Sequence, residues 1–317
     1  MNKQQRGLTL IELMISMVLS LGLIAGISSL FLQMQKSNKV QRGLSAMADD
    51  SSYVQEVLQK EMRSIGRLRS RSDTNGTNEQ VFLNPPGDVL GSSLDLLQGE
   101  YIKGNDTSPE NDSFVMRYQL LDANDLRRTG NPSNGSSPCT QDVLMDDTDP
   151  IDPAAPAGAK AGDPASVVHI VNVYFYLNGN TLSCLAQRHL VTVGSPGTSQ
   201  CIKNCNVPGS DTDFTHSSTP IPIIGNVVRL LLDYGVDTDA DNAANYYVKA
   251  PDVDVGANHW SDVVSVRMTV VVRSEDKFIR DSAVAYKLDG VDETPADDQH
   301  QLYKVFTTTI ALRNQLM

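Results

Sequence analysis

The stretch RGLTLIELMISMVLSLGLIAGISSLFL, residues 6–32, decides how this chain is organised. From residue 8 onward it is almost entirely apolar, with Glu12 as the single charged side chain. A helix rises about 1.5 Å per residue, so this segment would span about 37 Å, more than the roughly 30 Å hydrocarbon core of a bilayer. Two basic residues, Lys3 and Arg6, precede residue 8, and basic residues favour the cytoplasmic side. We therefore predict a single transmembrane helix over residues 8–32, with its amino terminus in the cytoplasm.

Two common interpretations of an apolar amino terminus fit this segment less well. A secretory signal has an apolar region of about 7–15 residues before a small-x-small cleavage site, and this segment is much longer. A plain uncleaved anchor leaves Glu12 unexplained, because an unpaired carboxylate at the bilayer centre costs at least about 2.5–3.5 kcal/mol. The sequence therefore indicates that Glu12 has a partner.

The heptapeptide RGLTLIE at residues 6–12 resembles the processing signal of type IV prepilins and type II secretion pseudopilins. The resemblance implies a leader peptide of residues 1–7, cleavage between Gly7 and Leu8, and N-methylation of Leu8. It also implies that Glu12 acts in filament assembly. The chain departs from the family pattern at Leu8, where Phe or Met is usual. It also lacks the proline that bends the anchor helix of many major pilins.

Beyond residue 32 the apolar residues become periodic. One stripe with steps of three and four is formed by Val40, Leu44, Met47, Val54, Leu58 and Ile65, with Ser51 at the missing step. This spacing is typical of an amphipathic helix. We predict one helix over residues 8–66, transmembrane over 8–32 and amphipathic over 33–66, close to 90 Å long at about 1.5 Å per residue. Its apolar half needs a membrane or partner helices, and its amphipathic half needs a sheet.

The remaining residues, 67–317, are predicted to form a β-rich globular domain. Runs of β-branched and aromatic residues predict strands at 79–83, 113–120, 169–177, 181–188, 227–236, 262–274 and 304–312. The turn sequence LNGN at 177–180 predicts a hairpin between the third and fourth of these strands. Residues 146–165 are rich in Pro, Ala, Gly and Asp, so the segment 121–165 is predicted to be a surface loop.

The order of these elements predicts an α+β fold class. A long amino-terminal helix would pack on a mostly antiparallel sheet with long loops, which is also the pilin fold that the leader implies. In the segment 262–274 the even-numbered residues from Val264 to Val272 are apolar, and most of the residues between them are polar. This alternation is typical of a strand with one covered face.

Three late segments resemble the PilW family of minor pilins. They are DYGVDTD at 233–239, the stretch 264–274 and TIALRN at 309–314. The resemblance implies a minor pilin that helps to initiate pilus assembly in a tip complex and is needed for pilus biogenesis and twitching motility. The implied partners are other minor pilins, the major pilin, the prepilin peptidase and the inner-membrane assembly platform. The implied location is the inner membrane, with the carboxy-terminal domain in the periplasm, and then the pilus at the cell surface.

Other classes of function are weighed against this one. A type II secretion pseudopilin of the GspJ type shares the leader and the general fold. A surface adhesin or a DNA-uptake pilin is a further possibility, although a formal net charge of -12 argues against nucleic acid as a partner. A membrane-tethered periplasmic enzyme is disfavoured, because no G-x-S-x-G, P-loop, dinucleotide-binding or H-E-x-x-H motif occurs. The sequence predicts no enzyme and no cofactor.

The cysteines favour disulfides if the domain is exported. The four cysteines are Cys139, Cys184, Cys201 and Cys205. An even number in an exported domain favours two disulfide bonds. A bond within the short loop from Cys201 to Cys205 would leave the other two as partners, but three connectivities remain open. A zinc site that adds His189 and His216 is the less favoured alternative.

An acidic run offers the one weak candidate for a metal site. Asp237, Asp239 and Asp241 alternate as at the start of an EF-hand calcium loop. However, Asn242 takes the place of the loop glycine, and Val248 takes the place of the bidentate Glu. A solvated acidic turn is therefore favoured, and no metal is predicted.

Overall fold

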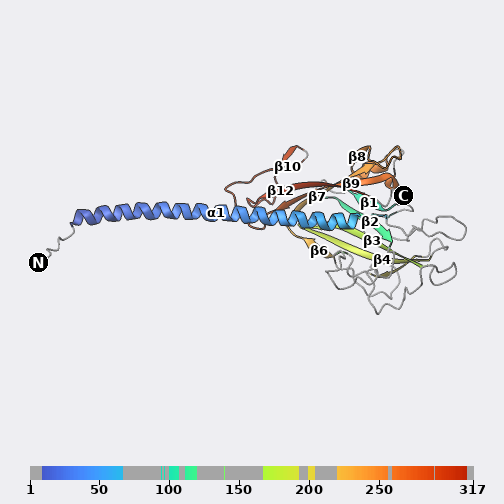
Figure 1. The fold of residues 1–317 in the computed structure, drawn as a ribbon, viewed down its shortest axis with the longest axis horizontal. Helices are drawn as coiled ribbons and strands as arrows, with labels where there is room; N and C mark the ends of the chain where they lie inside the picture. Colours follow the sequence, from blue (N-terminus) through green and yellow to red (C-terminus); the bar gives the residue numbers. More distant parts are fainter. Residues whose placement is uncertain are drawn as a thin grey trace.

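A long helix that projects from a β-rich body dominates the molecule (Figure 1). The computed structural model describes residues 9–66, 94, 96, 100–106, 111–119, 139, 167–192, 199–203, 220–255, 259–288 and 290–312. The helix α1 covers Leu10–Met62, which at about 1.5 Å per residue is about 80 Å. Its carboxy-terminal half lies along the sheets, and its amino-terminal half extends away from them (Figure 1).

The helix begins and ends close to the predicted bounds of 8–66. Thr9 is its N-cap, and residues 63–66 form turns after Met62. Gly66 has a φ of 68°, a left-handed conformation that glycine adopts without strain. Its backbone N–H donates to the carbonyl of Arg117 at 3.0 Å, so the chain leaves the helix attached to the sheet.

The described strands form two sheets and a separate hairpin. The strands are β1 Ile102–Asn105, β2 Ser113–Gln119, β3 Val167–Asn178, β4 Thr181–Thr192, β5 Ser199–Lys203, β6 Ile221–Ile224, β7 Val227–Val236, β8 Tyr246–Val248, β9 Val263–Arg273, β10 Tyr286–Leu288, β11 Val291–Glu293 and β12 Tyr303–Ala311. The larger sheet has the order β1-β2-β3-β4-β5, with β6 also paired to β4, and the smaller has the order β12-β9-β7-β8. Among these described strands every pairing is antiparallel. Two short helices, α3 Ala250–Val253 and η4 Trp260–Asp262, connect β8 to β9.

The predicted α+β class is confirmed, and six of the predicted strands are present within a few residues of their expected bounds. They are β2, β3, β4, β7, β9 and β12. The LNGN turn joins β3 to β4 as predicted, with Gly179 at a φ of 61°. The predicted strand 79–83 lies outside the described residues, as does the predicted loop 121–165 apart from Cys139.

The prediction for the helix stripe was wrong at one position. Met47, Val54 and Leu58 are buried as expected, but Leu44 is 50% exposed. Gly43 faces the core instead. A β-carbon placed there would lie 3.5 Å from Ile279 and 3.5 Å from Leu302. The segment after β9 and the residue before β12 thus pack against the helix at a position where it has no side chain.

The prediction of one covered face was also incomplete for β9. The even-numbered residues of the strand are buried as expected, but Val263, Ser265 and Val271 on the opposite face are buried too. Tyr286 and Leu288 of the β10–β11 hairpin cover Val271 and form a small second core with it. The sheet is therefore covered on both faces at that end.

A buried aspartate joins the two sheets. The backbone N–H of Asp112 donates to the carbonyl of Leu230 at 2.8 Å, and its carboxylate accepts from the N–H of Leu232. The strand β8 pairs with β7 only from Tyr234 to Val236, so Asp112 supplies partners to β7 where β8 does not reach. Burial of this carboxyl group raises the pKa of Asp112 to about 7.

Because of this raised pKa, the stability of the fold should depend on the pH at Asp112. The folded protein holds a proton there up to about pH 7, whereas the unfolded chain releases it near the ordinary pKa of 3.8. This contribution is fully present below pH 3.8 and is lost as the pH rises through 7. Asp112→Asn keeps an acceptor for Leu232 but cannot ionise, so its free energy of unfolding should fall less between pH 5 and pH 8 than that of the wild type. Urea titrations of the detergent-solubilised chain, followed by Trp260 fluorescence, measure this difference; parallel pH profiles would contradict it.

Candidate functional site

The start of α1 is closed by reciprocal hydrogen bonds between Thr9 and Glu12. The backbone N–H of Glu12 donates to the hydroxyl of Thr9 at 3.3 Å. The backbone N–H of Thr9 donates to the carboxylate of Glu12 at 3.0 Å, and its hydroxyl lies 3.1 Å from the same oxygen. This is a capping box, which satisfies donors that would otherwise lack partners at a helix start. The predicted assembly residue is thus hydrogen-bonded within its own chain.

The amino-terminal half of α1 is exposed throughout. The exposed large apolar side chains of this half are Leu10, Ile11, Leu13, Met14, Ile15, Met17, Val18, Leu19, Leu21, Leu23, Ile24, Ile27, Leu30, Phe31, Leu32 and Met34. The helix is long and apolar enough to cross a membrane, and none of its most apolar stretch is buried within the chain. Burying such a side chain stabilises a structure by about 1.5–3 kcal/mol. This half of the helix therefore needs an apolar environment from outside the chain.

Two glycines inside this half leave space for another helix. Gly22 and Gly26 are one helical turn apart, and a β-carbon at either would meet no atom of the described residues within 4 Å apart from the adjoining helix backbone. A G-x-x-x-G step allows close approach between membrane helices. Within the described residues, no packing contact requires glycine at these two positions.

The body of the protein contacts α1 from the end of its apolar half onward. The ammonium group of Lys36 lies 2.6 Å from the carboxylate of Asp281. Farther along, the ammonium group of Lys304 donates to the hydroxyl of Ser51 at 3.3 Å. The pair Lys36–Asp281 joins residues 245 positions apart, and no local sequence pattern signals it. The globular part thus begins two residues after Met34, the last exposed apolar residue of the series.

The predicted processing residues cannot be placed. Gly7 and Leu8 lie outside the described residues, so cleavage between them and methylation of Leu8 stay predictions. Glu12 lies four residues beyond Leu8, at the first turn of α1.

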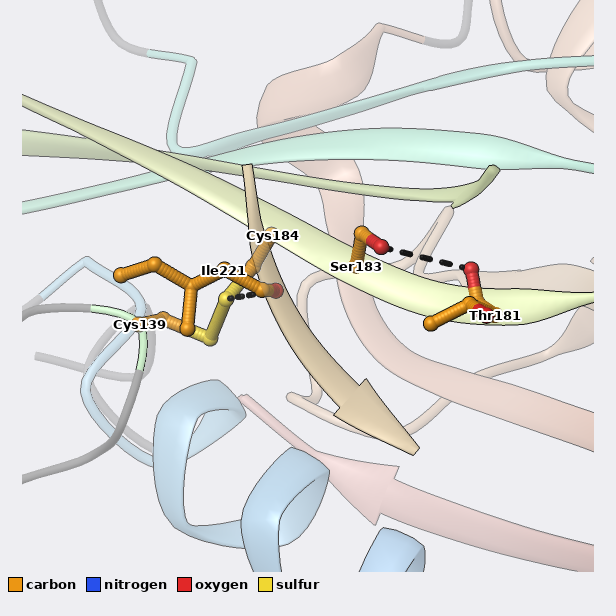
Figure 2. The surroundings of a disulfide bond; sticks show 5 residues. All are labelled: Cys139, Thr181, Ser183, Cys184 and Ile221. Atoms are coloured by element: carbon orange, nitrogen blue, oxygen red, sulfur yellow. Dashed lines mark hydrogen bonds between the residues drawn. A yellow bond between two sulfur atoms is a disulfide. The ribbon is translucent and has the colours of Figure 1, made fainter. Parts of the chain in front are cut away.

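A disulfide bond connects Cys139 and Cys184, one of the pairings that the sequence left open (Figure 2). Cys184 lies on β4, and its sulfur is 3.7 Å from the carbonyl oxygen of Ile221 on β6. Both cysteines are fully buried, and the bond ties a distant segment to the larger sheet. Cys205 and the side chain of Cys201 lie outside the described residues, so their pairing stays a prediction.

The acidic run forms a compact loop between β7 and β8. Carboxylate oxygens of Asp237, Asp239 and Asp241 lie within 4.8 Å of one another. Partial burial acts to raise the pKa of Asp237, but the backbone N–H groups of Asn242, Asp239 and Ala240 outweigh it and hold that pKa below its ordinary value. The carboxylate of Asp237 is therefore already engaged in holding the loop together.

Comparisons with known proteins match both ends of the chain. The prokaryotic N-terminal methylation motif matches residues 2–28, and the Type IV Pilus-assembly protein W family matches residues 206–314. Among solved structures, a type IV-like pilin from Thermus thermophilus is similar, with 9% sequence identity and a TM-score of 0.39 over 85% of this chain and 96% of the other. No curated protein matches the chain.

The matched segments contain the elements described above. The methylation motif includes the capping box and most of the exposed half of α1, and the PilW match includes the strands from β6 to β12. These assignments point to a structural pilin rather than an enzyme. The amino terminus of the chain is thus similar to the prepilin-type methylation motif, and its last third is similar to the PilW family of pilus-assembly proteins.

Proposed function

We propose that this chain is a minor pilin that helps to initiate a type IV pilus, in a complex with other minor pilins at the filament tip. The observation that carries the proposal is the division of α1 into an exposed apolar half and a half that packs on the sheets. An exposed apolar surface of this size is not stable in water. The exposed apolar half of α1 would be buried in a bilayer before assembly and among like helices of the filament after assembly.

The proposed location follows from the same division. The inner membrane would hold residues 8–32, with the leader in the cytoplasm and residues 67–317 in the periplasm. Two basic leader residues support this orientation, and so does the disulfide bond of the body, because disulfides are typical of exported domains. The prepilin peptidase would then cleave after Gly7, and the inner-membrane assembly platform would pass the subunit into the filament.

The size of the globular part supports a tip position. About 250 residues follow α1, which is large for a subunit packed many times along a thin shaft. A tip complex needs few copies and leaves space above the domain. The shared apolar helix would still allow the major pilin to assemble beneath it.

Deletion of the gene, with plasmid complementation, tests this role. Pilus number and twitching motility should fall sharply while the cellular level of the major pilin stays normal, because initiation rather than subunit supply is lost. Quantitative proteomics of sheared pili should find this chain far below the major pilin in abundance. Near-equal abundance would contradict initiation and indicate a shaft subunit.

The same deletion strain separates a pilus from a secretion machine. The PilW match favours the pilus. If piliation were intact while export of folded enzymes to the medium stopped, the type II secretion alternative would replace this proposal.

A further inference from the structure

Phe278 is held in an exposed position by its surroundings. Its side chain is 71% exposed, and its φ of 55° lies in the left-handed region that non-glycine residues rarely adopt. Its N–H donates to the carbonyl of Gln299 at 2.8 Å, and its ring has an edge contact with His300, which also has a left-handed φ. The next residue, Ile279, is buried against the core beside Gly43. The backbone strain thus directs one apolar side chain inward and the neighbouring aromatic ring outward.

This ring lies at the level where α1 leaves its apolar half. Asp281, three residues after Phe278, contacts Lys36, and the exposed apolar series ends at Met34. Two residues of helix correspond to about 3 Å. Among the described segments of the body, the connection from β9 to β10 extends farthest along α1 toward its amino terminus (Figure 1). If the apolar half spans a bilayer, Phe278 therefore lies near the lipid headgroups.

The charges at this level are mostly basic. After Glu12 the next charged residues of α1 are Lys36, Lys39 and Arg42, and the next acid is Asp49. On the body, Lys277 and Arg280 flank Phe278. Two acids, Asp297 and Asp298, precede the residues that bond to this segment, but Asp297 is paired with Arg273 and Asp298 accepts a hydrogen bond from the hydroxyl of Tyr303.

The acidic residues that begin the same connection lie farther from the membrane end. Burial, Asp49 and then Glu275 raise the pKa of Asp50, which places Glu275 close to that residue of α1. Asp50 is 14 residues beyond Lys36, about 21 Å along the helix. Asp276 follows Glu275, and Asp281 is paired with Lys36. The connection thus runs from an acidic start to a basic, aromatic tip.

We infer that this tip, residues 277–281, binds the headgroup region of an anionic bilayer while the subunit waits in the membrane. Aromatic rings and basic side chains favour this region, where the ring is partly buried and the charges meet lipid phosphates. The inference rests on the proposed membrane anchoring of α1. The contact would fix the tilt of the body over the membrane and would have to break when the subunit leaves for the filament.

Tryptophan fluorescence of the full chain tests the contact. Trp260, the only tryptophan, is buried in the core, so it contributes a constant background. Phe278→Trp would be reconstituted in vesicles of phosphatidylcholine and phosphatidylglycerol whose acyl chains are brominated close to the headgroup. The emission of the new tryptophan should fall roughly twofold relative to vesicles without bromine, because it lies at interface depth. Tyr246→Trp, on β8 at the opposite end of the body, is the matched control and should not be quenched (Figure 1).

Charge and anchoring are tested in the same preparation. Replacing Lys277 and Arg280 by Glu in the Phe278→Trp chain should abolish the quenching. Flotation with vesicles separates the two ideas: a chain that does not float would overturn the anchoring and this inference with it. Flotation without quenching at position 278 would overturn this inference alone. Protection of that tryptophan from quenching only in assembled filaments would also overturn this inference. It would assign the ring at position 278 to a contact between subunits.

Discussion

Glu12→Ala is expected to insert into the membrane and to be processed normally, but to enter filaments at least about tenfold less often than the wild type. The resemblance to prepilins implies that this carboxylate pairs with the methylated terminal amine of a neighbouring subunit, which here would be that of Leu8. Removing one partner of a buried ion pair leaves the other charge uncompensated, at a cost of about 3–5 kcal/mol. The ratio of this chain in sheared pili to its level in the membrane measures the effect.

Two control variants separate ion pairing from helix capping, because Glu12 also caps α1 through Thr9. Glu12→Gln keeps an oxygen that can accept from the N–H of Thr9 but carries no charge. Thr9→Ala weakens the capping box but keeps the carboxylate. If ion pairing governs assembly, Glu12→Gln should behave like Glu12→Ala, and Thr9→Ala should behave like the wild type. Normal incorporation of Glu12→Gln would exclude charge pairing as the cause.

Gly104→Ala should destabilise the fold by about 3 kcal/mol, since overpacking a closed core forces side chains and backbone apart. A β-carbon on Gly104 would collide with the hydroxyl and ring of Tyr234. That ring is fully buried and meets Trp260 edge to face, with 4.7 Å between ring centroids, so it has little space to move. The clash therefore falls at the junction between β1 and the smaller sheet.

Urea unfolding of the detergent-solubilised chain measures this effect, with Trp260 as the fluorescent probe next to the clash. Gly225→Ala is the matched control, because a β-carbon there meets no atom within 4 Å, and it should unfold at the wild-type midpoint. Equal midpoints for the two variants would show that Tyr234 moves aside without cost.

The long elements could be predicted from the sequence because their patterns are local. The apolar run sets the first half of α1, and the dense β-branched segments set β7, β9 and β12 within one or two residues. The error at Leu44 has a different origin. A helical stripe indicates a face only to within one neighbouring position, and the close approach of Ile279 to Gly43 decided which residue turned inward. That approach comes from a segment more than 200 residues away.

Short strands had weaker signals. The strand β1 has the sequence IKGN, which shows neither alternation nor β-branched enrichment, so only its pairing with β2 defines it. The hairpin β10–β11 did carry a signal, since Asp289-Gly290 is a typical turn dipeptide, but strands of three residues gave it little support. Without that hairpin, the burial of Val271 could not be foreseen.

The residues of the candidate site also differ in how far the sequence could predict them. Glu12 could be found because a carboxylate in an apolar run is conspicuous and because the surrounding motif is specific. The contact of Lys36 with Asp281 and the outward ring of Phe278 depend on a connection that folds back along the helix. No pattern within either segment indicates that return.

The capping box also bears on what would hold a subunit in a filament. Before assembly the carboxylate of Glu12 already accepts hydrogen bonds from Thr9, so it is not an unsatisfied charge held in store. In the proposed filament, a neighbouring amine would replace one set of partners of this carboxylate by another, so the net gain would be the difference between two satisfied states. That difference is smaller than the cost of about 3–5 kcal/mol that follows when only one partner of the pair is removed. A subunit joined in this way would be held mainly by the summed contacts of its apolar helix.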